Sequence, residues 1–228
     1  MVSNSEPVAE GTVIMADDQF AGRGQQGNTW ISKAGLNLTF SIYLKPNFLP
    51  VHRQFDLNIA VSIGINNALK LYLDKDLRVK WPNDIYYKDQ KIGGILIENT
   101  ISATTIKSSI IGIGLNVNQL EFDGNMRNKA SSLGEILHQH VDLPLLLERI
   151  CQGVEAQYLR LRAGHEPKMR LEYLENLYRY GESARYKSAS DVFDGEIIGV
   201  SDEGRLIILT AREERTYGFK EIEFLDKN

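Results

Sequence analysis

The sequence predicts an α+β protein in which a mixed, mostly antiparallel sheet packs against helices and a small β-barrel follows. Three observations indicate this class. Strand patterns dominate the first half of the chain, helical spacing takes over from Ser131, and short strand patterns about ten residues apart return after Gly181. Strands followed by helices are typical of α+β architecture. We therefore predict one domain over residues 1–182 and a second over 183–228.

The composition bounds the class of protein. The chain has 228 residues, 43% of them hydrophobic, which suffices for one sizeable core and a small second unit. A net charge of −4 argues against a broad nucleic-acid surface, and the single cysteine, Cys151, cannot form an internal disulfide. No apolar run is long enough to span a membrane, and residues 1–11 lack the apolar core of a signal peptide. We expect a soluble, cytoplasmic protein.

The first half of the chain is predicted to form strands around one central helix. Apolar residues at helical spacing over Asp56 to Leu73 predict that helix. Alternating or apolar runs predict strands at 11–16, 36–44, 77–81, 85–87, 91–98 and 106–117.

The second half is predicted to form three helices and then the barrel. Helices are expected over 131–138, from the Asp142 cap to about Arg162, and from Pro167 through Tyr178. The barrel strands are expected at 184–186, 193–200, 205–210, 215–219 and 222–225.

A glycine-rich loop, Ala21 to Trp30, is the strongest functional signal. It contains the pattern G-x-G-x-x-G, but a strand rather than a helix follows it, which removes the physical basis of a dinucleotide fold. Its glycines still allow backbone N–H groups to approach an anion, and Arg23 adds a permanent cation. A flexible surface loop is an equally good interpretation of this stretch alone.

Lys80 is the second candidate. Leu77, Val79 and Trp81 share one face of the predicted strand, which turns Lys80 to the other face near the strand end. Pro82 restricts the backbone there. An ordinary solvated lysine remains the alternative.

Two later stretches, one with paired glycines and one with two asparagines, are also candidates for the site. Gly93 and Gly94 interrupt an apolar strand, which indicates a bulge or a group packed on the backbone. Asn116 and Asn118 carry amides that either bind a ligand or shape a turn. The four histidines show no metal spacing, and Cys151 lies among apolar helix residues, so we expect no metal site and no protein nucleophile.

Four blocks in order resemble biotin protein ligases. They are D-D-Q-F-A-G-R-G-Q-Q-G-N-T-W at 17–30, V-K-W-P-N-D-I at 79–85, K-I-G-G-I-L-I-E at 91–98 and G-I-G-L-N-V-N at 112–118. The resemblance runs from about Gly11 to the C-terminus. It implies the fold of the biotin and lipoate ligases, which is similar to class II synthetases, with an SH3-like C-terminal barrel.

The resemblance also implies an activity. Members of the family join biotin to ATP, with Mg²⁺, as biotinyl-5'-adenylate and pass the biotinyl group to a lysine of a biotin carboxyl carrier protein. Such chemistry needs fixed cations and N–H donors rather than a nucleophile. DNA binding and membrane binding are not implied.

Site residues carried over by resemblance fall into three groups. Lys80 and Arg23 are the expected catalytic cations. Biotin contacts are expected from Gln19, Gly22, Arg23, Gly24, Gln25, Lys80, Gly93 and Gly94. Nucleotide contacts are expected from Arg23, Gln26, Asn28, Trp30, Lys80, Asn83 and Asn116.

Two departures from the family pattern carry expectations. Gln25 stands where many relatives have an arginine that helps close the loop over the adenylate. We therefore expect either that another cation replaces this arginine or that biotinyl-adenylate escapes from the site. The family's first strand and Ser-Thr-Asn turn are not found before Gly11. We expect a truncated chain with an unpaired sheet edge, and such an edge favours self-association as a homodimer. Alternative functions are lipoate or octanoate transfer, which the K-W-P-N-D block disfavours, and a biotin-binding form without full activity.

Overall fold

The computed structural model describes residues 8–27, 29–122, 129–189 and 191–225. The chain divides into two compact units: Met1–Val51 with Gln90–Leu147, and His52–Asp89 with Glu148–Asn228. The domain boundary expected between residues 182 and 183 falls inside the second unit, immediately before strand β9 (Ser183–Ser188). That boundary remains a prediction.

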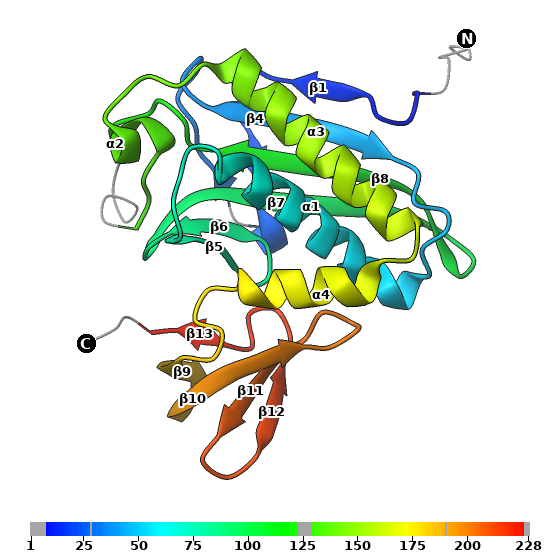
Figure 1. The fold of residues 1–228 in the computed structure, drawn as a ribbon, viewed down its shortest axis with the longest axis vertical. Helices are drawn as coiled ribbons and strands as arrows, with labels where there is room; N and C mark the ends of the chain where they lie inside the picture. The colour runs from blue at the N-terminus through cyan, green and yellow to red at the C-terminus, as the bar shows by residue number, and fades with distance from the viewer. Residues whose placement is uncertain (1–7, 28, 123–128, 190, 226–228) are drawn as a thin grey trace. The chain divides into compact units, whose positions relative to one another are not determined.

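The first unit is built on an antiparallel sheet. Its strands are ordered β1 (Val13–Met15), β4 (Leu38–Leu44), β8 (Thr105–Leu115) and β7 (Gln90–Ser102), and Figure 1 shows them side by side. In β4 the alternate residues Leu38, Phe40, Ile42 and Leu44 are all buried. The period-two pattern therefore places one strand face in the core, as expected.

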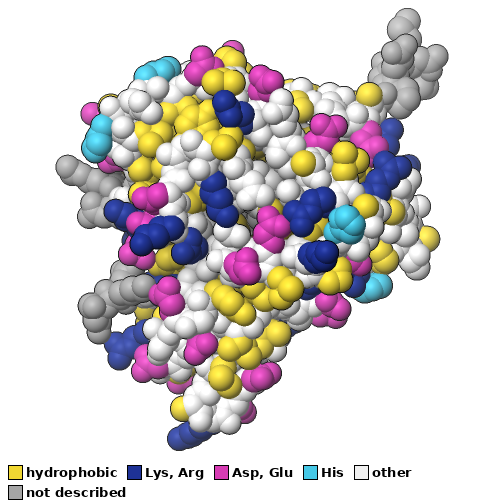
Figure 2. Space-filling view, viewed as in Figure 1, with side chains coloured by type: hydrophobic (Ala, Val, Ile, Leu, Met, Phe, Trp, Pro, Cys, Tyr) yellow, Lys and Arg dark blue, Asp and Glu magenta, His cyan; other side chains and the backbone are white. Residues whose placement is uncertain are grey.

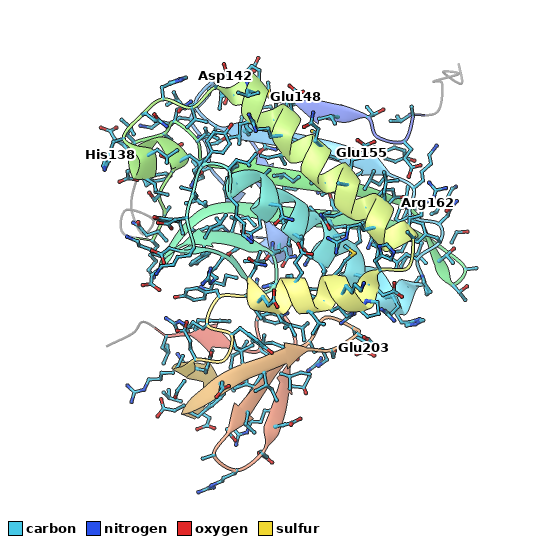
Figure 3. The ribbon with its side chains drawn as sticks, in the orientation of Figure 1. His138, Asp142, Glu148, Glu155, Arg162 and Glu203 are labelled. Carbon is cyan, nitrogen blue, oxygen red and sulfur yellow. The ribbon has the colours of Figure 1, made fainter. Side chains whose placement is uncertain are left out.

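Shorter elements complete this unit. The glycine-rich loop holds β2 (Gly22–Arg23), the 3₁₀ turn η1 (Gln25–Gly27) and β3 (Thr29–Trp30). Helix α2 (Leu133–Leu137) begins where the Ser132 hydroxyl accepts a hydrogen bond from the Glu135 backbone N–H. It ends at His138, labelled in Figure 3, whose φ of 54° is left-handed.

The second unit contains the central helix. Helix α1 (Gln54–Leu69) follows η2 (Val51–Arg53) and is buried on nearly every side. Gly64 of α1 lies against Gly153, which belongs to the helix of residues Leu143–Arg162. A side chain at either glycine would overlap the backbone of the opposite helix. The buried carboxylate of Asp56 is paired with Arg53 and Arg170, each at 2.6 Å.

Helix α3 (Leu143–Arg162) starts as the sequence predicts. The Asp142 carboxylate accepts a hydrogen bond of 2.8 Å from the Leu145 backbone N–H. Figure 3 shows Glu148, Glu155 and Arg162 along this helix, and all three are exposed. Residues seven apart on a helix project from nearly the same side. The side of α3 that carries these three residues is therefore charged and faces solvent.

The remaining elements of the second unit are a hairpin, a helix and a sheet. Strands β5 (Leu77–Lys80) and β6 (Asp84–Tyr87) form the hairpin, and helix α4 (Glu166–Glu175) follows α3. The C-terminal sheet is antiparallel, in the order β12 (Glu214–Tyr217), β11 (Leu206–Thr210), β10 (Asp191–Val200), β9 and β13 (Glu223–Phe224). The predicted α+β class is confirmed, and the five strands are compatible with an SH3-like arrangement.

Two helices end three or more residues before their predicted ends. Helix α4 ends at Glu175 rather than Tyr178, because the next segment pairs with β5. The Val79 N–H donates to the Asn176 carbonyl at 2.9 Å, and the Tyr178 N–H donates to the Val79 carbonyl at 2.8 Å. Backbone pairing with a distant strand thus outweighs helical spacing. Helix α1 ends at Leu69 rather than Leu73, because residues 70–72 form a turn in which the Tyr72 N–H donates to the Leu69 carbonyl at 2.9 Å.

The face of the molecule drawn in Figure 2 is mixed in charge. Figure 2 shows acidic and basic side chains interspersed over the face in view. No helix among the described residues has the length and apolar character needed to cross a bilayer.

Candidate functional site

The glycine-rich loop is a small hairpin. Gly22 pairs with Trp30 and Arg23 with Thr29, with η1 at the tip. Gly22 is buried, and a side chain there would overlap the Trp30 carbonyl and crowd the Gln19 amide oxygen. Glycine is therefore required where the two strands and Gln19 come together.

Trp30 lies on strand β8. A side chain at Gly114 would overlap the Trp30 indole, so the ring rests directly on the strand backbone. The Lys91 ammonium lies 5.8 Å from the centre of that ring, within cation–π range. Among the described residues, the buried Trp30 indole N–H has no hydrogen-bond acceptor. A buried donor of this kind favours a ligand that accepts from it.

Gly93 and Gly94 on β7 lie next to the contact between Trp30 and Gly114. Gly93 pairs with Leu115, and Gly94 pairs with Gly114, the residue under Trp30. Gly93 is buried and Gly94 is partly exposed. The structure thus brings Gln19, Gly22, Trp30 and Gly94, four of the predicted site residues, into one region.

The other loop residues vary in exposure. The Arg23 guanidinium lies 3.3 Å from the Glu98 carboxylate, and both side chains are largely exposed. Exposed ion pairs contribute only about 0.2–1 kcal/mol, so a substrate anion can replace Glu98 at low cost. Gly24 and Gln25 are partly exposed. Gln26 lies in η1, and Asn28 lies outside the described residues.

Asn116 has a structural task. It is buried, and its side-chain N–H₂ donates to the Ser131 carbonyl at 3.1 Å. Asn118 is similar, because its amide exchanges two hydrogen bonds with the Val141 backbone. The side-chain amides of Asn116 and Asn118, which directly follow β8, therefore stabilise the loop after the strand.

Lys80 and Asn83 belong to the second unit. The pattern of β5 is confirmed: Leu77, Val79 and Trp81 are buried, and Lys80 is on the partly exposed face. The Lys80 ammonium donates to the Tyr86 hydroxyl at 3.1 Å. It also lies 4.5 Å from the ring centre of Tyr86, 5.0 Å from that of Phe224 and 5.7 Å from that of Tyr178. Asn83 is partly exposed in the β5–β6 turn.

Two ionisable side chains are held neutral by their surroundings. Burial, together with the hydrogen bond to Asp89, raises the pKa of Tyr178 to about 12. Its hydroxyl remains protonated at neutral pH and donates to Asp89 at 2.5 Å. Burial also raises the pKa of the Cys151 thiol, which disfavours the thiolate that a nucleophile requires.

Several contacts were not anticipated from the sequence. Gly114 was a detectable signal, because a glycine within an apolar strand indicates close backbone approach. Lys91 beside Trp30, and Tyr86, Tyr178 and Phe224 beside Lys80, had no such signal, since their positions depend on tertiary structure. Among the described residues, no three His, Cys, Asp or Glu side chains gather as potential metal ligands.

Comparison with known proteins extends these observations. The bifunctional ligase/repressor BirA of Bacillus subtilis is 28% identical over 212 residues, which are 92% of this chain and 64% of BirA. A biotin–[acetyl-CoA-carboxylase] ligase of Paracoccus denitrificans is 27% identical over 201 residues, which are 86% of this chain and 82% of that protein.

A solved structure is also similar. The biotin protein ligase from Aquifex aeolicus in complex with biotin and ATP superposes with a TM-score of 0.80 at 26% identity, covering 97% of this chain and 91% of that chain. This chain therefore spans slightly less than two thirds of BirA and most of the other two proteins. Residues 2–116 match the biotin/lipoate A/B protein ligase family. The chain is a member of that family.

Proposed function

We propose that this chain activates biotin with ATP and transfers the biotinyl group to a lysine of a biotin carboxyl carrier protein. The observation that carries the proposal is the Trp30 indole resting on Gly114, beside Gly94 and the glycine hairpin, with a buried N–H that lacks an acceptor among the described residues. The Aquifex protein, similar over most of its length, is in complex with biotin and ATP. The name of the Paracoccus relative indicates the acceptor class.

The first step forms an acyl phosphate. A biotin carboxylate oxygen attacks the α-phosphorus of ATP, the bond to the bridging oxygen breaks, and pyrophosphate leaves. Both reactants are anionic, so fixed cations must offset their repulsion. We assign this task to Arg23 and Lys80. In the second step the acceptor amine attacks the acyl carbon, loses a proton, and AMP leaves.

The other residues position the substrates. Gln19 binds the ureido ring of biotin, with Gly22, Gly24 and Gln25 alongside, and Gly93 and Gly94 form the floor. Trp30 packs against the adenylate and its indole N–H donates to it. Gln26, Asn28, Asn83 and Asn116 remain proposed nucleotide contacts, and Asn116 has the least free capacity, because its N–H₂ group is bonded to Ser131.

Mg²⁺ is proposed as the companion of ATP. This ion is commonly held by substrate phosphates with only one or two protein ligands, so the partly exposed loop fits it without a dedicated cluster of carboxylates. When bound, it neutralises phosphate charge. Asn116 is the residue proposed to bind either the nucleotide or its Mg²⁺.

The remaining proposals concern partners and place. A homodimer is proposed because β1, with Val13, Ile14 and Met15 all exposed, ends the strand order of its sheet. The net charge of −4 and the mixed charges on the face in Figure 2 support a role without DNA. We propose a cytoplasmic location, where the single thiol stays reduced.

Biotin-dependent ATP–pyrophosphate exchange tests the function, with lipoate in a parallel reaction. Exchange with biotin alone, followed by biotinylation of a carrier domain but not of its Lys→Arg variant, is the expected result. Exchange with lipoate alone would move the assignment to lipoate transfer. Biotin binding by calorimetry without exchange would identify a binding protein. Free biotinyl-adenylate measured without acceptor tests whether Gln25 makes the loop leaky, and none accumulating would contradict that idea.

A further inference from the structure

The surroundings of Lys80 suggest a positioning role for the C-terminal segment. Three aromatic rings from three separate parts of the second unit lie around the ammonium: Tyr86 on β6, Tyr178 after α4, and Phe224 on β13. We call these three the ring cluster. Each ring centre lies within about 6 Å of the nitrogen, the range in which a cation is attracted to an aromatic face.

The rings of the cluster are themselves held in place. Tyr178 is fixed by its hydroxyl bond to Asp89 and by the backbone bond to Val79, the residue before Lys80. Phe224 pairs with Tyr186 across β13 and β9, and their rings meet edge to face at 5.3 Å. Tyr86 and Tyr178 pack together at 5.4 Å.

Trp81, the residue after Lys80, also contacts the C-terminal sheet and its turns. The buried Trp81 indole donates to the Gly204 carbonyl at 2.9 Å, in the turn between β10 and β11, and Trp81 packs on Phe219 at 5.4 Å. Lys80 and Trp81 are thus both contacted by residues more than 120 positions later in the chain, Gly204 included.

We propose that Tyr178 and Phe224 are positioning residues that hold the Lys80 ammonium in its reactive orientation. The inference rests on the proposed function, because it assumes that Lys80 acts on the biotin carboxylate. A free lysine side chain samples many rotamers, and restricting them before the substrate arrives lowers the barrier to reaction. The faces of the rings attract the ammonium and so favour the positions in which it lies beside them.

Three variants separate positioning from stability. Phe224→Leu removes the ring and keeps apolar volume, while Phe224→Tyr keeps the ring. Phe193→Leu is the matched control, because Phe193 also packs on Tyr186 in the C-terminal sheet but is not among the rings beside Lys80. Each protein is labelled with ¹³C-lysine, and the Lys80 ε-methylene resonance is assigned by its absence in Lys80→Arg.

The expected result has two parts. Phe224→Leu loses the ring-current shift of the Lys80 resonance, and kcat for adenylate formation falls roughly three- to tenfold, the size of one cation–π contact. The KM for ATP stays within about twofold, since the lost interaction orients a group in the transition state. Phe224→Tyr and Phe193→Leu behave as the parent.

Other outcomes overturn the proposal. An unchanged Lys80 resonance in Phe224→Leu shows that the ring is not beside the ammonium, and a shifted resonance with unchanged kcat shows that positioning is irrelevant. If Phe224→Leu does not fold, Phe224→Met, which also removes the ring and keeps apolar volume, provides the same pair of measurements, and the outcomes carry the same meaning. A parent protein with the ring-shifted resonance but no adenylate refutes the proposed function, and the positioning role with it, while leaving the ring contacts established.

Discussion

The glycine hairpin and the surroundings of Lys80 are built in opposite ways. The hairpin is local: Gly22 and Trp30 are eight residues apart in one recognisable block, and glycines admit the close backbone contact. The Lys80 surroundings are assembled from residues 86, 178 and 224, which lie in separate parts of the second unit. A sequence motif therefore reveals the first region, whereas only tertiary structure reveals the second.

The largest expected effect tests whether the cation of the Lys80 region is essential. Lys80→Met should lower adenylate formation by about a hundredfold or more, because a preorganised charge facing a developing anion is lost. Arg78→Gln is the control on the same face of β5, where the guanidinium donates to the Leu77 carbonyl. Pyrophosphate exchange measures both. Equal losses would show that Lys80 has no special role.

The next effect tests the hairpin region. Gly114→Ala places a methyl group against the Trp30 indole and should raise the KM for ATP roughly tenfold, since overpacking displaces the ring. Gly112→Ala is matched on the same strand, because its methyl group would meet the Leu96 carbonyl at an ordinary 3.5 Å. Steady-state kinetics on the two variants decide the point. A similar KM for both would separate Trp30 from the nucleotide.

A smaller effect concerns the pH response of the Lys80 region. The pKa of Tyr178 is raised to about 12 by burial and by Asp89, so its contribution to stability is complete below pH 10 and is lost as pH rises toward 12. Tyr178→Phe should therefore flatten the fall in the free energy of unfolding over that window, by less than about 1.4 kcal/mol per pH unit.

Urea unfolding at pH 9 and at pH 11.5 measures this change. Tyr180→Phe controls for the loss of a hydroxyl, because the Tyr180 ring is exposed. If Tyr178→Phe and the parent protein lose the same stability between the two pH values, Tyr178 does not titrate as its surroundings indicate.

The smallest expected effect concerns the Arg23–Glu98 pair. Glu98→Gln should lower the KM for biotin or ATP by about two- to threefold at low salt, because Arg23 is released for the substrate, and the gain should fade as salt screens exposed charges. Glu121→Gln, which breaks the similar Lys33–Glu121 pair, is the control. Identical responses in the two variants would mean that Glu98 does not compete for Arg23.

Much of the fold was predictable because its signals are local. Alternation in β4, the Asp142 cap of α3 and the regular spacing of the C-terminal strands identified these elements to within a few residues. Of the candidate site, glycine, arginine and strand patterns indicated the loop and Lys80 as candidates, and their roles stay predictions. The end of α4 was not, because the pairing of Asn176 and Tyr178 with Val79 depends on a strand about a hundred residues earlier.

The contact between Trp81 and Gly204 makes the fluorescence of Trp81 a probe of the C-terminal sheet. The sequence has two tryptophans: Trp81 is buried and donates to a carbonyl of the β10–β11 turn, whereas Trp30 is partly exposed on Gly114. Each unit therefore carries one tryptophan in a distinct environment. A red shift in the emission of Trp81 would report loosening of the turn, and quenching of Trp30 would report events at the hairpin, so single Trp→Phe variants would let the two units be followed independently.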